Sequence, residues 1–118
     1  MIVTGGANVY PAEVEAAIDA HPGVRSSAVI GLPDDDRGQV VHAIVDIPDL
    51  ELADAAAVEQ CTDALRAALR ERIVTYKVPR SFEFVSEPLR DDAGKVRRSA
   101  LRDERVQRGE SGAAGGAP

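Results

Sequence analysis

The sequence is poor in aromatic residues and in cysteine, and it contains no tryptophan. Aromatic residues make up 3% of the 118 positions, so the hydrophobic core must be built from Val, Ile, Leu and Ala. A chain of this length fits one domain with one core. The single cysteine, Cys61, excludes an intrachain disulfide, which is compatible with a reducing compartment.

Long apolar runs and clusters of positive charge are also missing. No stretch is long and apolar enough to cross a bilayer, and the first residues lack the basic start and the apolar region of a signal peptide. The formal net charge is −6, which argues against binding to nucleic acid or to an anionic membrane. We therefore expect a cytoplasmic protein without a transmembrane segment or a nucleic-acid partner.

Lysine is scarce among the basic residues. Of the 14 Lys and Arg residues, only Lys77 and Lys95 are lysines. A lysine carries a compact point charge and an arginine a planar fork, so the two side chains are not interchangeable. Each lysine in this arginine-rich sequence is therefore informative.

Hydrophobic periodicity and turn residues predict the element order β-α-β-β-α-β-α. We expect strands at residues 1–3, 27–31, 40–47 and 81–85, and helices at residues 11–21, 55–73 and 97–106. This order predicts an α+β domain, in which small antiparallel or mixed sheets pack against two main helices and a short C-terminal helix. We assign residues 1–106 to this domain and expect residues 107–118 to form a disordered tail.

Two apolar stripes support the helix predictions. Pro11 suits the first position of a helix, and Pro22 ends it by restricting the residue before it. The first helix should bury Val14, Ala17 and Ile18, and the longer one Val58, Cys61, Leu65, Leu69 and Ile73.

A glycine loop, residues 4–8, precedes the first helix. Gly5 and Gly6 permit positive φ angles and a close approach of backbone to a ligand, and Asn8 can bond locally. The simpler interpretation is a plain turn between a strand and a helix. The Gly-x-Gly-x-x-Gly spacing of a dinucleotide site is missing, so that fingerprint is excluded.

A second glycine precedes Lys95. The Ala-Gly-Lys segment is similar to the end of a phosphate-binding loop, but Leu89 stands where that loop needs glycine and Val96 where it needs Ser or Thr. A lysine on a flexible loop can still bring a charge to a phosphate or carboxylate. The simpler interpretation is a solvated surface lysine.

The sequence predicts no metal site. His21 and His42 are the only histidines, and neither has a second ligand set at metal-binding spacing, so we expect structural roles. We place Cys61 in the core and interpret the acidic run at residues 34–36 as a solvated turn.

Five segments, taken in order, carry a family resemblance over about residues 1–105. They are Gly-Gly-Ala-Asn-Val-Tyr-Pro-Ala-Glu-Val-Glu at 5–15, His-Pro-Gly-Val at 21–24, Ala-Val-Ile-Gly-Leu-Pro-Asp at 28–34, Tyr-Lys-Val-Pro-Arg at 76–80 and Gly-Lys-Val-Arg-Arg at 94–98. Together they resemble the C-terminal domain of the acyl-adenylate-forming, or AMP-binding, ligases. The segment at residues 8–11 looks most like the acyl-CoA synthetase branch.

The resemblance implies a role in two half-reactions. In that family a large N-terminal domain holds ATP, Mg²⁺ and the acid, and the C-terminal domain rotates between two poses. Lys95 matches the catalytic lysine that reaches the acyl carboxylate and the nucleotide during adenylation. Gly5, Gly6 and Ala7 match the loop that lines the pantetheine channel for CoA, with Asn8 and Glu13 as its structural support.

Cofactors and partners follow from the same resemblance. ATP or AMP, Mg²⁺ and CoA would serve the full enzyme, and none is expected to bind tightly to this domain alone. The implied partners are the large N-terminal domain, in cis or in trans, together with acyl-adenylate and CoA. We expect the domain to be inactive by itself.

Some residues depart from the family pattern. Gln39 stands where a Glu is common, and the hinge residue that precedes the first strand in the family is absent from this sequence. Asp91 and Asp92 add negative charge near Lys95, where they would weaken its pull on phosphate or pair with it at rest. These departures leave open an alternative: a non-catalytic remnant or interaction module from a split ligase gene.

Overall fold

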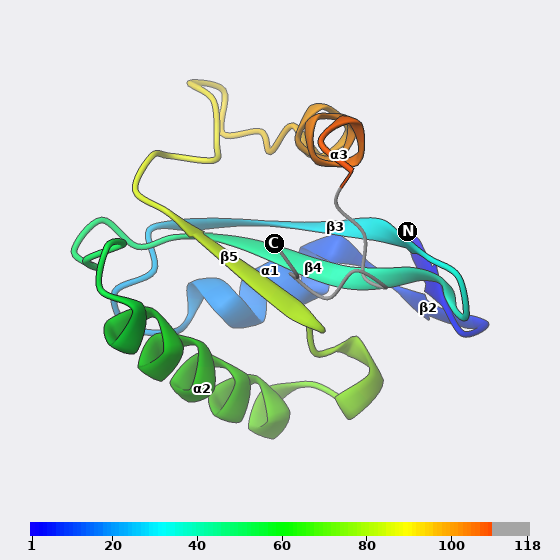
Figure 1. The fold of residues 1–118 in the computed structure, drawn as a ribbon, viewed down its shortest axis with the longest axis horizontal. Coiled ribbons are helices and arrows are strands. Elements are labelled where there is room, and N and C mark those ends of the chain that lie inside the picture. Colours follow the sequence, from blue (N-terminus) through cyan, green and yellow to red (C-terminus); the bar gives the residue numbers. More distant parts are fainter. Residues whose placement is uncertain (110–118) are drawn as a thin grey trace.

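The computed structural model describes residues 1–109 and has an α+β fold, as predicted (Figure 1). Beyond residue 109, the predicted tail lies outside the described residues. In chain order the elements are β1 Ile2–Thr4, β2 Ala7–Val9, α1 Pro11–Asp19, β3 Ser26–Asp34, β4 Gly38–Asp46, α2 Ala55–Arg72, the 3-10 helix η1 Thr75–Lys77, β5 Ser81–Val85 and α3 Arg98–Gln107.

The five strands form one mixed sheet with β4 at its centre. β3 and β4 pair as a long antiparallel hairpin, from Ser26 opposite Asp46 to Asp34 opposite Gly38. The other edge of β4 is shared, because β1 meets it antiparallel at Gly38 and β5 lies parallel to it along residues 42–46. The sheet therefore carries the N-terminal hairpin at one end of β4 and β5 at the other.

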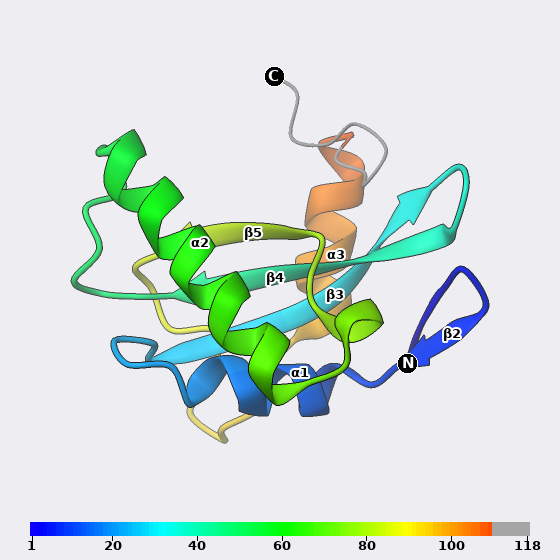
Figure 2. The ribbon, with the colours of Figure 1, turned by 90° about the horizontal axis from the view of Figure 1, so that it is seen from below.

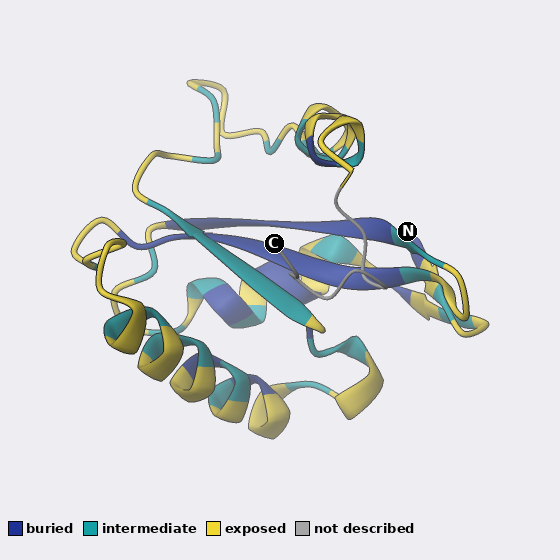
Figure 3. Cartoon of the chain, in the orientation of Figure 1, coloured by how far each residue is buried: buried dark blue, intermediate teal, exposed yellow. Residues whose placement is uncertain are grey.

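Helices cover both faces of the sheet (Figures 1 and 2). α1 and α2 pack on one face, over a core that includes Val29, Val45 and Leu65. α3 packs on the other face, over Ile30 and Ile44. Because β3 and β4 are covered on both sides, they read as nearly continuous apolar runs, and Figure 3 shows them buried along most of their length.

The helix predictions are confirmed in position and in their buried stripes. Val14 and Ile18 of α1 and Leu65 and Leu69 of α2 are fully buried, and the remaining predicted members of the stripes are partly buried. α2 begins where predicted because the Asp54 carboxylate accepts a hydrogen bond from the Ala57 amide at 3.1 Å. Partial burial on α2 also raises the pKa of the Cys61 thiol.

The expected loop at residues 4–8 was wrong, because it contains a strand, β2. Gly5 and Gly6 have φ angles of 55° and 84°, which are the two positive values that a type I′ turn requires. The chain therefore reverses on itself, and β1 and β2 pair from Ile2 opposite Val9 to Thr4 opposite Ala7. Strands of three residues are too short to give an alternating pattern, so sequence periodicity could not find β2.

Arginines attach α3 to the rest of the fold. Arg98, Arg102 and Arg105 share one face of the helix because they are spaced four and three residues apart. Arg98 pairs with the buried Glu15 carboxylate of α1, with Nε 2.7 Å from Oε2, and this pairing raises the pKa of Arg98. Arg102 donates to the Gly31 carbonyl oxygen at 2.9 Å. The predicted helix is confirmed, but its attachment is largely polar.

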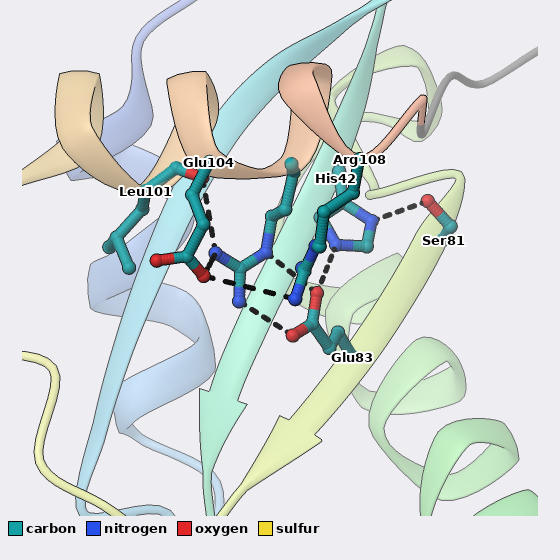
Figure 4. Close-up of polar contacts among 7 residues, drawn as sticks. His42, Ser81, Glu83, Leu101, Glu104 and Arg108 are labelled. Carbon is teal, nitrogen blue, oxygen red and sulfur yellow. Dashed lines mark hydrogen bonds and ion pairs between the residues drawn. The ribbon is translucent and has the colours of Figure 1, made fainter.

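A polar cluster beneath α3 explains the predicted structural role of His42 (Figure 4). His42 Nδ1 lies 2.7 Å from the Ser81 hydroxyl, and Nε2 lies 3.2 Å from Glu83 Oε1. Arg105 donates from Nε to the same Glu83 carboxylate at 2.8 Å. Burial acts to raise the pKa of Glu83, but the hydrogen bonds from His42 and Arg105 outweigh it and lower the pKa to about 2.

Candidate functional site

The glycine hairpin is tied to the turn between β3 and β4. The Gly5 amide donates to the Arg37 carbonyl oxygen at 3.0 Å, and the Val3 amide donates to Gln39 Oε1 at 3.0 Å. Gln39, a departure from the family pattern, thus supports β1. A Cβ at Gly5 or Gly6 would meet no atom within 4 Å, so the tip of the hairpin is open to a ligand while its backbone conformation still demands glycine.

The other residues predicted for this loop lie on different elements. Ala7 and Asn8 belong to β2, where Asn8 is exposed and pairs with Val3. Glu13 lies on α1 and binds Lys77 of η1, with Nζ 2.8 Å from Oε1. The hydrogen bond from Glu13 is the main reason that the pKa of Lys77 is raised. Glu13 therefore links α1 to η1, next to the hairpin rather than at its tip.

A pocket of about 230 Å³ lies beside the hairpin, between β4, α2 and the segment that contains η1. The exposed Tyr76 lines it, with apolar residues from β4 and from the segment after η1. Four arginines also line it: Arg37, Arg66, Arg70 and Arg80. Arg37 belongs to both features. Its carbonyl oxygen accepts a hydrogen bond from the Gly5 amide, and Arg37 is also one of the residues that line the pocket.

The charge of this pocket contrasts with the net charge of the chain. Within the described residues, the only carboxylate paired with its arginines is Asp34, whose Oδ2 lies 3.7 Å from Arg37 Nη1. Arg66 stacks over the Phe82 ring at 5.2 Å and donates to the Arg80 carbonyl oxygen. Four arginines around one hollow, with a single paired carboxylate among the described residues, favour a polyanionic ligand.

Lys95 lies on a closed loop between β5 and α3. Arg90 and Val96 form an isolated antiparallel bridge, and the Asp91 amide donates to the Lys95 carbonyl oxygen at 2.9 Å. The Asp91 carboxylate accepts from the Ala93 and Lys95 amides at 2.9 and 3.0 Å. The loop is therefore held by backbone contacts, and its lysine side chain extends into solvent.

Of the two alternatives for Asp91 and Asp92, pairing with the Lys95 ammonium is not seen. Asp91 instead binds Arg97, whose Nη2 lies 3.0 Å from Oδ2. The hydrogen bond from the Lys95 amide is the largest contribution to the lowered pKa of Asp91, and Arg97 adds to it. Over residues 1–109, no hydrogen bond or ion pair engages Lys95 Nζ, so the ammonium is available to a ligand.

The two candidate sites lie far apart. In both ribbon views the hairpin of β1 and β2 is at one end of the molecule, and the loop between β5 and α3 is at the opposite end (Figures 1 and 2). Arg90 Nη2, at the base of the loop, lies 3.7 Å from Asp19 Oδ2 at the C-terminal end of α1, whereas the hairpin precedes the N-terminal end of that helix. The structure thus brings the glycine hairpin together with the arginine pocket, and it does not bring either close to Lys95.

Residues 1–109 form neither a candidate metal site nor a membrane-spanning helix. Among residues 1–109, no group of three or more His, Cys, Asp or Glu side chains is arranged to hold a metal ion. Within the same residues, no helix combines the length and the apolar character of a membrane span.

Sequence reasoning missed the arginine pocket and the role of Asp91. Arg66 and Arg70 are spaced four apart on α2, which places them on one face, and this was the available signal. Arg37 and Arg80 come from other elements and join that face only through the sheet pairing. Asp91 was interpreted only through its charge, as weakening Lys95 or pairing with it, because its backbone partners are not visible in the sequence.

Comparisons with known proteins point to one family. Residues 13–95 match the AMP-binding enzyme C-terminal domain. The chain is 43% identical over 106 residues to the 3-[(3aS,4S,7aS)-7a-methyl-1,5-dioxo-octahydro-1H-inden-4-yl]propanoyl:CoA ligase of Rhodococcus jostii, a match that covers 89% of this chain and 19% of that protein. It is 38% identical over 104 residues to the long-chain-fatty-acid–CoA ligase FadD13 of Mycobacterium tuberculosis, which covers 88% of this chain and 19% of the ligase.

Solved structures agree with these relatives. An acyl-CoA synthetase of Brucella canis superimposes with a TM-score of 0.79 at 28% identity, over 92% of this chain and 19% of that one. A fatty acyl CoA synthetase of Mycobacterium tuberculosis gives a TM-score of 0.74 at 35% identity, over 92% of this chain and 20% of that one. The chain thus spans about a fifth of the length of the proteins that it matches.

Proposed function

The chain belongs to the AMP-binding enzyme C-terminal domain family, and from this premise we propose that it is the mobile C-terminal domain of an ATP-dependent carboxylic acid–CoA ligase. In this proposal one end of the domain serves adenylation of the acid and the other serves thioester formation. The observation that carries it is that the Lys95 loop and the glycine hairpin lie at different ends of the molecule, near opposite ends of α1 (Figures 1 and 2). A rotation of the domain would present each end in turn.

Lys95 is the residue that we assign to adenylation. When the acid attacks the α-phosphorus of ATP, anionic groups come together, and a positioned ammonium stabilises the developing charge. The side chain of Lys95 is exposed and its Nζ has no partner within residues 1–109, so no ion pair must break before it acts. ATP and Mg²⁺ would be held by the large domain.

The hairpin and the arginine pocket are the features that we assign to CoA. CoA combines a polyanionic end, with a diphosphate and a 3′-phosphate, and a thin flexible pantetheine arm. The pocket offers four arginines to the phosphates, and the open hairpin at Gly5 and Gly6 lies directly beside it through Arg37. This adjacency fits both parts of CoA, and the arm could then run past the glycine backbone.

A domain-replacement experiment tests the proposal. The chain would be fused to, or mixed with, the large domain of the Rhodococcus jostii ligase and assayed for ATP–pyrophosphate exchange with that ligase's own acid. We expect no exchange from the 118-residue chain alone and measurable exchange from the fusion.

The matched control is the same large domain with its own C-terminal domain. If that control is active and the fusion and the mixture are both inactive, the proposal fails. The alternative of a non-catalytic remnant or interaction module would then be favoured.

A further inference from the structure

The loop that carries Lys95 is organised around one carboxylate, that of Asp91. Oδ1 accepts from the amides of Ala93 and Lys95, and Oδ2 accepts from Nε and Nη2 of Arg97 at 3.2 and 3.0 Å. The backbone of Asp91 closes the same loop, because its carbonyl oxygen accepts from the Gly94 amide at 2.8 Å. One residue thus fixes the backbone on both sides of Gly94.

A second contact closes the loop from the outside. Arg90 Nη1 donates to the Gly94 carbonyl oxygen at 2.9 Å, and the Arg90–Val96 bridge sets the loop's base. These contacts restrain the backbone of residues 90–96, while the Lys95 side chain has no restraint within residues 1–109. The loop is therefore built to place the lysine's Cα and to leave its ammonium available.

The charge of Asp91 is balanced within the loop. Arg97 occupies Oδ2 and both amides occupy Oδ1, so the carboxylate does not need the Lys95 ammonium as a counter-ion. Its lowered pKa agrees with this geometry and keeps the carboxylate ionised at neutral pH. A carboxylate next to a catalytic cation would ordinarily compete with the phosphate for that cation. Here Arg97 binds the Asp91 carboxylate, so Asp91 does not compete for the Lys95 ammonium.

We propose that Asp91 is a positioning residue for adenylation, which holds the Lys95 backbone in the geometry from which the ammonium reaches the acid and the nucleotide. This inference rests on the proposed role of Lys95. It assigns to Asp91 no contact with the substrate. The acceptor oxygen is what matters, so asparagine, which keeps one carbonyl oxygen for the two amides, should substitute for Asp91.

The test uses the fusion enzyme described above and compares Asp91→Ala, Asp91→Asn and the matched control Asp92→Ala. For Asp91→Ala we expect the kcat of adenylation to fall by about tenfold to a hundredfold, because the catalytic group is misplaced. Thioester formation from supplied acyl-adenylate should stay within about twofold of the parent, since that step uses the other end of the domain. Asp91→Asn should recover most of the lost rate, and Asp92→Ala should match the parent.

A second measurement separates positioning from misfolding. Amide hydrogen exchange in the 118-residue chain should be faster at Ala93 and Lys95 in Asp91→Ala, and unchanged in the strands β3 and β4. Asp91→Asn should keep the protection of both amides.

Three results would overturn the inference. One is an Asp91→Ala enzyme that adenylates at the parent rate while Lys95→Ala does not. Another is equal loss of both half-reactions in Asp91→Ala, which would indicate general damage. The third is an Asp91→Asn variant as slow as Asp91→Ala, which would show that the acceptor oxygen is not the cause. If Lys95→Ala itself adenylates normally, the proposed function fails first, and this inference fails with it.

Discussion

The two ends of this domain are organised by different means. At the hairpin end, the geometry is set by backbone conformation, since Gly5 and Gly6 occupy positive φ angles that only glycine adopts without strain. At the Lys95 end, backbone bonds and Gly94 also shape the loop, but a side chain adds to them: the Asp91 carboxylate accepts from the Ala93 and Lys95 amides. A channel for the flexible pantetheine arm needs open space at the hairpin. The placement of one ammonium needs a fixed backbone at Lys95.

The two ends also differ in how many cations they present. The hairpin end presents four arginines around one pocket, a broad field that suits a ligand with several phosphates. The other end presents one ammonium whose neighbouring carboxylate is already neutralised by Arg97. The first arrangement tolerates the loss of one cation better than the second.

The largest effect is expected from Lys95→Ala. Removing the single ammonium should lower ATP–pyrophosphate exchange in the fusion enzyme by about a hundredfold or more, because the developing charge loses its stabilising group. The KM for CoA should not change. Lys95→Arg is the matched control, because it keeps the positive charge and changes the shape of the cation. The assignment would be contradicted if Lys95→Ala kept an exchange rate near that of the parent.

The next effect is expected from Gly6→Leu at the opposite end. A bulky residue at the hairpin tip should slow thioester formation by about tenfold, because it narrows the route for the pantetheine arm and strains a positive φ. Adenylation should be unaffected. Gly109→Leu is the control, since Gly109 has a φ of 83° against 84° at Gly6 and is equally open. Equal damage from both variants would show that backbone strain is responsible.

A smaller effect is expected from Arg70→Ala in the pocket. Loss of one of four arginines should raise the KM for CoA by about threefold to tenfold, an effect that weakens as salt is added. Arg72→Ala, on the same helix but outside the pocket, is the control. Titration of CoA in the fusion enzyme at two ionic strengths measures it, and identical CoA affinities for both variants would remove the pocket from the site.

The smallest effect concerns the attachment of α3, which follows the Lys95 loop directly. The pKa of Glu83 is lowered to about 2 in the folded state, so its contribution to stability is complete above its unfolded pKa of about 4.5 and is lost as the pH falls toward 2. We expect a loss of about 1–2 kcal/mol in the free energy of unfolding, discounted for the partial exposure of Glu83. Urea denaturation between pH 5 and pH 2.5 measures it.

Glu83→Gln tests the source of that loss. The variant should be less stable than the parent at pH 6 and should lose less stability on acidification. Amide exchange should quicken in α3 before it does in β1 and β2, because Glu83 binds α3 through Arg105. A parent and a variant with the same pH dependence would exclude Glu83 as the cause.

The sequence predicted most of the fold because its helices and long strands carry strong signals. Leu65 and Leu69 repeat at helical spacing, Pro11 marks a helix start, and β3 and β4 form long apolar runs. β2 was missed because its turn chemistry, two adjacent glycines, is shared by hairpins and open loops. The distinction depends on the φ angles, which the residue types permit but do not fix.

The candidate sites were less predictable than the fold. Lys95 and the glycines were found through their resemblance to a family, since their local chemistry also suits surface residues. The arginine pocket combines Arg37 from a turn, Arg70 from α2 and Arg80 from the segment before β5, and no sequence spacing links them. Asp91 shows the same limit at short range, because its effect on Lys95 depends on which groups its oxygens accept from.

The most direct test of the account is a crossed comparison of the two half-reactions. Lys95→Ala and Gly6→Leu fusion enzymes would each be given ATP with the acid, and separately the preformed acyl-adenylate with CoA, in single-turnover experiments. We expect Lys95→Ala to lose only the first reaction and Gly6→Leu only the second. If either variant loses both reactions to the same degree, the two ends do not serve separate steps, and the central claim is wrong.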